Sequence, residues 1–455
     1  MGSLKPSHET HLMHRSMASE PHKVVSAKGH YLTLASGETI LDACGGAAVA
    51  CIGGGNQEVI DAMTSQAQQA SYVHTQAYGT DSGEELADLI LEGSPHGLEK
   101  AFFVSGGSEA VEAALKMARQ FHFERNDKER IHFVSRQQSY HGSTMAAMSV
   151  SSNLPRKIPY EGFGHQQVSW VTPAYAYRYQ QESETEEQFA ARLVKELEDE
   201  FLRVGPEKVA AFIAETVVGA TTGCVAPPKG YFRGVRKVCD KYGVLLILDE
   251  VMCGTGRTGT YFAFEQEEDV VPDILTLAKG LGGGYASIAG VVMHKKVVDV
   301  IRSGTSAFNH GHTYQAHPIA CATALAVQRI IRRDGLVTRC AKMGKLLEAK
   351  LRSELSQCKS VGDIRGRGLF WGIEFVKGAK TKEAFDPRIA YGVKVQQAAF
   401  EKGVAIYPGA MTIDGRKGDN VLLAPPYTVT EEELSRICAV VREAITEMEA
   451  VYITE

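Results

Sequence analysis

An α/β fold with a mostly parallel sheet flanked by helices is predicted by two features of the sequence. Short apolar runs alternate with stretches of helical periodicity from about Ala101 to Met293. Because helices cover both faces of a parallel sheet, its strands appear as continuous apolar runs. Polar residues follow several of these runs, and ligands in such sheets bind beyond the carboxyl ends of the strands. The same pattern therefore predicts both the sheet and the edge at which it binds a ligand.

The elements follow in chain order. The predicted strands cover residues 101–104, 131–135, 209–214, 244–248, 273–277 and 288–293. A helix from Leu336 to about Leu355 then leads into a smaller C-terminal region with a strand pair within residues 364–375. Its last helix begins at a capping box, Thr430 with Glu433, followed by apolar residues at helical spacing. A chain of 455 residues is long enough for two or three domains.

Composition limits the function and the location. The net charge of -5, with mixed signs, leaves no broad basic surface, so we expect no nucleic-acid partner. No apolar run approaches the roughly twenty residues that cross a bilayer, so we expect no membrane association. The polar first thirty residues lack a secretion segment, and Glu9 and Glu20 disfavour a mitochondrial presequence. Nine cysteines without Cys-x-x-Cys spacing suit a reducing compartment, and we expect a cytoplasmic protein.

Two oppositely charged residues end two of the predicted strands. Asp249 follows the run at 244–248, and Lys279 follows the run at 273–277. Pyridoxal phosphate requires such a pair, because a lysine attaches it as a Schiff base and an anion keeps its ring nitrogen protonated. Two plainer interpretations stay open at this point. Asp249 caps a helix or pairs with Arg257, and Lys279 is a solvated loop lysine.

A glycine-serine turn joins the first predicted strand to an amphipathic helix. Gly107 allows close approach of the backbone to a ligand, Ser108 supplies a hydroxyl, and the start of the helix favours an anion. The turn has neither the spacing of a dinucleotide fingerprint nor the Gly-Lys-Ser/Thr of a P-loop. It indicates a phosphate site, with an ordinary N-capped helix as the alternative.

Further candidates lie near the ends of other predicted strands. Tyr140 can stack on a planar cofactor, and Val251 can press on the opposite face of its ring, although both residues also suit a plain core. The loop from Asn309 to Pro318 is rich in histidine, but His310, His312 and His317 lack the spacing of a zinc helix. We therefore expect no metal site.

Taken together, these motifs resemble the class III pyridoxal phosphate-dependent aminotransferases, also called the ω-transaminase group. The resemblance runs from about Tyr31 to the C-terminal helix. It depends most on the order of four motifs: Leu248–Val251, Gly254–Gly259, Ala278–Leu281, and His310–Thr313 ahead of Pro318. It implies the fold of the aspartate aminotransferase superfamily, fold type I. It also implies an N-terminal segment (1–65) that contributes to the small domain and to dimer contacts, a large cofactor-binding domain (66–330) and a C-terminal small domain (331–455).

The resemblance also implies roles for particular residues. Lys279 would attach the cofactor and later move a proton between the substrate and the cofactor. The other implied cofactor contacts are Asp249 at the ring nitrogen, Gly107 and Ser108 at the phosphate, Tyr140 and Val251 on the ring faces, and His141 and Glu215 nearby. Thr313 would complete the phosphate site of the neighbouring subunit in a homodimer. Glu215 has an alternative interpretation as a surface carboxylate at a strand end.

Substrate recognition is less determined. Many relatives that act on ornithine or 4-aminobutyrate carry glutamine where this chain has Met252, which cannot donate a hydrogen bond. This departure favours enzymes that accept amines more widely. Arg416 is a candidate for a substrate carboxylate, with a solvated loop arginine as its alternative. Ala47, Tyr78 and Tyr427 are candidates for the pocket wall.

The sequence therefore predicts a homodimeric aminotransferase that moves an amino group from a primary amine or ω-amino acid to a 2-oxo acid such as pyruvate. A decarboxylase or aminomutase with the same cofactor, and a non-catalytic relative that binds a phosphate ligand, are the alternatives.

Overall fold

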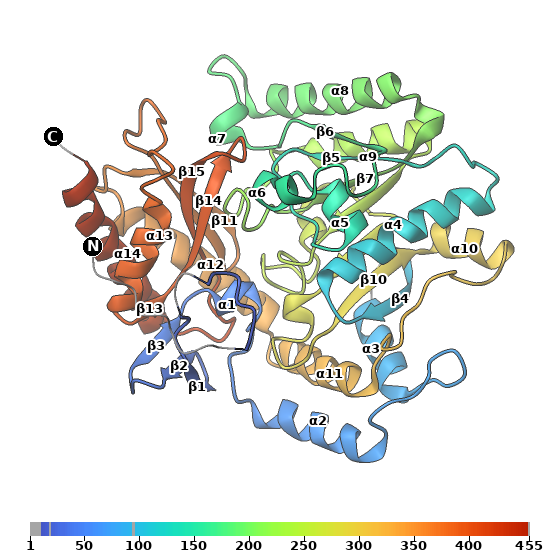
Figure 1. The fold of residues 1–455 in the computed structure, drawn as a ribbon, viewed down its shortest axis with the longest axis horizontal. Helices are drawn as coiled ribbons and strands as arrows, with labels where there is room; N and C mark the ends of the chain where they lie inside the picture. The colour runs from blue at the N-terminus through green and yellow to red at the C-terminus, as the bar shows by residue number, and fades with distance from the viewer. Residues whose placement is uncertain (1–10, 18–19, 93–95, 454–455) are drawn as a thin grey trace.

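A computed structural model describes residues 11–17, 20–92 and 96–453. Its largest sheet has seven strands in the order β4-β10-β9-β8-β7-β5-β6 (Figure 1). The strands are β4 (Leu98–Val104), β10 (Ala289–His294), β9 (Ile274–Leu277), β8 (Leu245–Asp249), β7 (Val209–Glu215), β5 (His132–Arg136) and β6 (Val168–Val171). Strand β10 is antiparallel to both of its neighbours, and the remaining pairs are parallel. The predicted mostly parallel sheet is therefore confirmed.

All six predicted strands are present in this sheet, with ends that differ by a few residues. The sequence analysis missed β6, a four-residue strand that pairs only with β5 at the edge of the sheet. Trp170 within β6 is exposed, so the strand lacks the continuous apolar run by which the other strands were found.

Alternate side chains of the sheet enter two separate cores. Ala211 and Ile213 of β7 pack on one face with α4 (Gly107–Glu124) and α10 (Lys295–Ser303). Phe212 of β7 packs on the other face with α8 (Glu186–Val204) and α9 (Tyr231–Tyr242). Because successive strand residues point to opposite faces, one continuous apolar run fills both cores.

Two smaller sheets lie outside the large one, and the first of them combines strands from both ends of the chain. One has the order β1-β2-β3-β13, formed by β1 (Val24–Lys28), β2 (Tyr31–Leu34), β3 (Thr39–Asp42) and β13 (Val404–Ala405). The other is antiparallel, with the order β11-β12-β15-β14, formed by β11 (Val361–Arg367), β12 (Phe370–Phe375), β15 (Lys417–Leu423) and β14 (Tyr407–Ile413). The parallel pairing of β3 with β13 places the N-terminal strands beside the C-terminal region. The domain boundaries near residues 65 and 330 stay predictions.

Two helices of the C-terminal region were predicted and are present, and a third, α13, was not predicted. Along the chain, helix α12 (Leu336–Glu354) precedes β11, and helix α13 (Tyr391–Glu401) lies between β12 and β13. Helix α14 (Glu431–Tyr452) begins at the predicted capping box, in which Thr430 and Glu433 bond each other's backbone N–H groups. In the described ranges, no helix combines the length and the apolar character needed to cross a membrane.

Candidate active site

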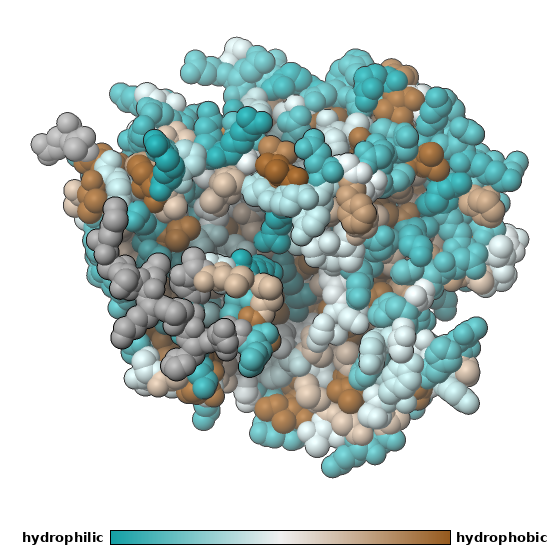
Figure 2. Space-filling model, in the orientation of Figure 1, coloured by the Kyte–Doolittle hydropathy of each residue, from teal (hydrophilic) through white to brown (hydrophobic). Residues whose placement is uncertain are grey.

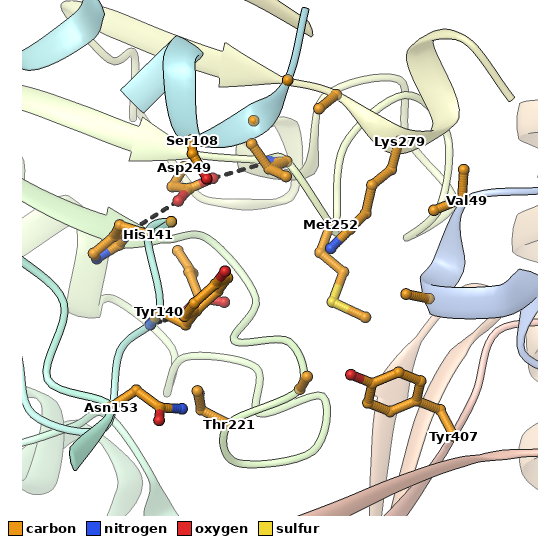
Figure 3. Close-up of a pocket in the computed structure, with 18 of the residues that line it drawn as sticks. Val49, Ser108, Tyr140, His141, Asn153, Thr221, Asp249, Met252, Lys279 and Tyr407 are labelled. Atoms are coloured by element: carbon orange, nitrogen blue, oxygen red, sulfur yellow. Dashed lines mark hydrogen bonds and ion pairs between the residues drawn. The ribbon is translucent and has the colours of Figure 1, made fainter. Parts of the chain in front are cut away.

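A cavity of about 520 Å³ lies beyond the carboxyl ends of the parallel strands (Figure 3). Figure 2 shows a hollow near the centre of the face viewed in Figure 1, on a surface that is otherwise mostly hydrophilic. Nine of the predicted site residues line the cavity: Ala47, Gly107, Ser108, Tyr140, His141, Glu215, Asp249, Val251 and Lys279. The structure therefore brings together residues more than two hundred positions apart in the sequence.

Asp249 ends β8 and is 4% exposed. Its carboxylate bonds the His141 ring (Oδ2–Nδ1 2.8 Å) and accepts from the backbone N–H of Val251 (3.0 Å) and the hydroxyl of Thr276 (3.2 Å). Arg257 instead donates to two backbone carbonyls, so the suggested pair with Asp249 does not form. These donors hold the carboxylate as an oriented anion at the wall of the cavity.

Lys279 directly follows the β9 region, and its side chain extends into the cavity. Burial lowers the pKa of its amine, and the negative charges of Asp249 and Glu215 oppose this shift. The backbone of Lys279 has φ 45°, a left-handed conformation that is uncommon and strained for a residue other than glycine. Strain and a lowered pKa are both features of functional sites, and they exclude the solvated loop lysine.

Gly107 and Ser108 begin α4 at the edge of the cavity. A Cβ at Gly107 would lie 2.9 Å from Cγ1 of Val251, so only glycine lets the turn lie this close. The hydroxyl of Ser108 accepts a hydrogen bond from the N–H of Ser143 (3.0 Å). The N-cap interpretation also holds, because Glu109 accepts from the N–H of Ser105 and of Gly106. The first amides of the helix lie at the cavity and favour an anion there.

Tyr140 and Glu215 are joined across the cavity wall. The N–H of Tyr140 donates to Oε1 of Glu215 (3.2 Å), and the N–H of Gly219 donates to Oε2 (2.9 Å). Burial raises the pKa of the Glu215 carboxyl. Because Glu215 is 7% exposed, its interpretation as a surface carboxylate is wrong.

Four of the candidate residues do not line this cavity. Tyr427 was wrongly predicted as a wall residue, since it is fully buried, donates to the Thr255 carbonyl (3.0 Å) and lies against the Arg257 guanidinium. Tyr78, Thr313 and Arg416 are exposed and do not line the cavity.

The cavity also has lining residues that the sequence analysis did not propose. They come from loops, from the short helix α6 (Leu154–Lys157) and from the antiparallel sheet: Arg15, Val49, Asn153, Arg156, Thr221, Ser287 and Tyr407. None of these residues directly follows a predicted strand of the large sheet, so the rule that found Asp249 and Lys279 could not find them. Met252, singled out for its chemistry, lies in the cavity beside Lys279 (Figure 3).

Comparison with known proteins identifies the family. The chain matches the family described as "Aminotransferase class-III" over residues 13–445, and it belongs to that family. An uncharacterized aminotransferase of Schizosaccharomyces pombe is 50% identical over 442 residues, covering 97% of this chain and 96% of the relative.

Solved structures of transaminases support the same family. An omega transaminase from Pseudomonas jessenii in complex with PMP superposes with a TM-score of 0.88 at 32% identity, covering 95% of this chain and 93% of the other. An (S)-enantioselective omega-transaminase from Thermomicrobium roseum superposes with a TM-score of 0.88 at 35% identity, covering 97% and 96%. The fold is therefore that of the fold type I transferases, as predicted.

The protein is thus a class III aminotransferase that depends on pyridoxal phosphate. The residues of the cavity fit this cofactor. They supply a buried anion, an amine of lowered pKa, an aromatic ring, and a glycine turn at a helix start for a phosphate.

Proposed function

We propose that this aminotransferase moves an amino group from a primary amine or ω-amino acid to a 2-oxo acid such as pyruvate, and that it acts as a homodimer. The observation that carries the proposal is the meeting of Asp249, Lys279 and the Gly107–Ser108 turn in one cavity. A volume of about 520 Å³ suits a cofactor together with a small substrate. Bound pyridoxal phosphate supplies an aldehyde that accepts the amino group and a ring that stabilises negative charge on the substrate carbon.

Lys279 is proposed as the residue that attaches the cofactor and moves the proton. A general base works best when its pKa lies near the working pH. Burial lowers the pKa of the Lys279 amine toward that range. The Nζ atom has no hydrogen-bond partner in the ranges that the structure describes, and it points into the cavity, where it can reach a bound substrate.

Asp249 is proposed to bind the ring nitrogen, and His141 to orient Asp249. The three donors to the carboxylate leave acceptor capacity free, because an ionised carboxylate has about four lone-pair sites. A protonated ring nitrogen would take such a site and compensate the cost of burying the charge. Tyr140 and Val251 would then lie on the two faces of the ring, and Glu215 near its edge.

Gly107 and Ser108 are proposed to bind the phosphate, and Thr313 to complete this site in the partner subunit. Support for the second role is that Thr313 is exposed, lies outside the cavity of its own subunit and belongs to the His310–Thr313 motif.

Mixed dimers test whether Thr313 acts across subunits. One subunit carries Lys279→Ala and the other Thr313→Asp, which repels a phosphate. If Thr313 serves the partner, each mixed dimer contains one intact site, and mixing two inactive variants restores activity. The two variants carry different affinity tags, so that mixed dimers can be isolated on both tags in turn. Isolated mixed dimers without activity would overturn the role across subunits.

Visible absorption tests the reaction itself. Amines and amino acids are added one at a time to the holoenzyme without any 2-oxo acid. A donor that bleaches the band of the bound cofactor, followed by recovery on addition of pyruvate, is the expected result. A band that no donor in the panel bleaches contradicts the proposed substrate class.

A cytoplasmic location remains our inference. It is supported by nine free thiols, as a reducing compartment would maintain. Fractionation of cells, followed by detection of the protein, tests it, and recovery in an organelle fraction would contradict it.

A further inference from the structure

We propose that Arg156 binds a substrate carboxylate in this active site. The inference rests on the proposed function, because it assigns the carboxylate-recognising residue of the same cavity. It replaces Arg416, which the sequence analysis suggested for this task.

Arg156 lies at the cavity, beside the predicted ring-stacking tyrosine. It lines the cavity together with Asn153 and Tyr140. Its Nη1 atom lies 3.3 Å from the Tyr140 hydroxyl, and its Cζ atom lies 4.9 Å from the centre of the Tyr140 ring. The guanidinium is therefore within the site and contacts a residue that faces the proposed cofactor position.

The charge of Arg156 is not neutralised by the protein. Across the described ranges, Arg156 forms no salt bridge, and its side chain is exposed at the cavity. The carboxylates that line the cavity are Asp249 and Glu215, and both already accept hydrogen bonds from neighbouring groups. Arg15 also lines the cavity and adds a second positive charge. The substrate part of the cavity therefore favours an anion and disfavours a second ammonium group.

A short helix holds Arg156 in place. Helix α6 (Leu154–Lys157) is fastened by Lys157, which donates to the carbonyls of Ser149 (3.0 Å) and Ser151 (2.8 Å). The Lys157 ammonium also lies 4.3 Å from the centre of a Trp170 ring. Consecutive helix residues point about 100° apart, so anchoring Lys157 leaves Arg156 directed elsewhere, toward the cavity. A guanidinium on an anchored segment can bind a carboxylate through two parallel hydrogen bonds.

Arg416 provides a matched control. It is an exposed arginine outside the cavity, on the turn between β14 and β15. The same turn packs on α6, because a Cβ at Gly415 would lie 3.2 Å from Leu154. Both arginines are therefore exposed and lie near helix α6, but of the two only Arg156 lines the cavity.

The experiment compares substrates that differ by one carboxylate. In the donor arm, 5-aminopentanoate and pentylamine react with a fixed acceptor. In the acceptor arm, pyruvate and acetaldehyde react with a fixed donor. The ratio of kcat/KM with the carboxylate to kcat/KM without it is measured for the wild type, Arg156→Gln, Arg156→Lys and Arg416→Gln. The band of the bound cofactor and the thermal midpoint confirm that each variant is folded.

We expect Arg156→Gln to lower the ratio at least about tenfold in one arm, which also identifies whether the donor or the acceptor carries the recognised carboxylate. Arg156→Lys should retain part of the preference, because it keeps the charge but loses the paired geometry. Arg416→Gln should leave the ratio within about twofold. A purely structural role through Tyr140 would lower kcat/KM for both members of a pair and leave the ratio unchanged.

Two results would overturn the proposal: an unchanged ratio in both arms for Arg156→Gln, or a fall in the ratio for Arg416→Gln alone. A wild type that reacts with no amine would instead contradict the proposed function, so the two failures are distinguishable.

Discussion

Two regions of this protein bury charged side chains, and they differ in how completely those charges are paired. In the first, around Glu374 of β12, the carboxylate accepts from the hydroxyl of Tyr175, from Arg178 (2.6 Å) and from Arg365 (2.7 Å). Arg365 also donates to the carbonyl of Gly223 (2.7 Å). This cluster connects the small antiparallel sheet to the segment at α7 (Ala176–Tyr179) with its charges neutralised from within.

The second region is the cavity, where polar groups remain open. Lys279 has no hydrogen-bond partner within the described ranges, and Nε2 of His141 is buried without one. Native proteins rarely leave buried polar atoms unpaired, because each costs about 1–3 kcal/mol. The Glu374 cluster therefore pairs its charges within the protein, whereas polar groups that line the cavity remain open to a ligand. The two regions are also connected, since Arg365 holds the loop that brings Thr221 to the cavity.

The largest expected effect follows from replacing Lys279, whose amine lies in the cavity. Lys279→Ala should leave less than about a hundredth of the wild-type turnover, because the reaction loses its nucleophile and base. The thermal midpoint of the apoenzyme should change little, because the Lys279 side chain forms no hydrogen bond or salt bridge within the described ranges. Steady-state assays and thermal unfolding measure both effects. Lys295→Ala, at an exposed lysine, is the control, and residual turnover above a hundredth in Lys279→Ala would refute the role.

Removing the carboxylate of Glu374 should have the opposite effect, lowering stability rather than turnover. Glu374→Ala leaves Arg178 without a counter-charge and leaves Arg365 paired with Asp363 alone, which should lower the free energy of unfolding by about 3 kcal/mol. Denaturant unfolding measures this loss. Asp386→Ala, which breaks an exposed pair with Arg388, should cost less than about 1 kcal/mol. Equal losses in the two variants would mean that the Glu374 cluster does not stabilise the fold.

A pH series sharpens the comparison at Glu250, the neighbour of Asp249 that faces away from the cavity. Its carboxyl accepts from the Thr216 hydroxyl and from the N–H groups of Ala263 and Phe264. Burial nevertheless raises the pKa of Glu250 from 4.5 to about 7. The folded state therefore binds more protons than the unfolded chain between these pH values, so the contribution of Glu250 to stability is greatest below 4.5 and is lost as the pH rises through about 7.

The variant Glu250→Gln cannot ionise and isolates this effect. The free energy of unfolding of the wild type, relative to the variant, should fall by about 3 kcal/mol across that pH range. Glutamine has one side-chain oxygen where glutamate has two, and this difference changes the stability of the variant by an amount that does not depend on pH. The change of the stability difference with pH is therefore the result that tests the raised pKa. Urea unfolding at several pH values measures it, and a difference that is constant with pH would contradict the raised pKa.

The smallest expected effect concerns the glycine turn. Gly107→Ala introduces a Cβ 2.9 Å from Val251 and should raise the dissociation constant of the cofactor by about three- to tenfold. Gly79→Ala is the control, because Gly79 does not line the cavity and its Cβ meets nothing within 4 Å. Fluorescence titration of the apoenzyme with cofactor measures both, and equal affinities would show that the close approach at Gly107 does not matter.

Six of the seven strands of the large sheet, and the residues at its edge, could be predicted from the sequence. Asp249, Lys279 and Glu215 each follow a buried strand, and the carboxyl ends of parallel strands meet at one edge, so their meeting in one cavity was predictable. The capping box of α14 was predictable because its hydrogen bonds join residues three apart.

Only the tertiary structure decided the rest of the cavity wall. Arg156 and Tyr407 come from a short helix and from the small sheet, and no local pattern distinguishes a loop side chain that faces a cavity from one that faces solvent. The wrong prediction for Tyr427 has the same cause. Its position in the sequence did not show that it would pack against Arg257 and be buried there. Helices and strands can be predicted because their periodicity depends on neighbouring residues. The direction of a loop side chain instead depends on packing between segments hundreds of residues apart.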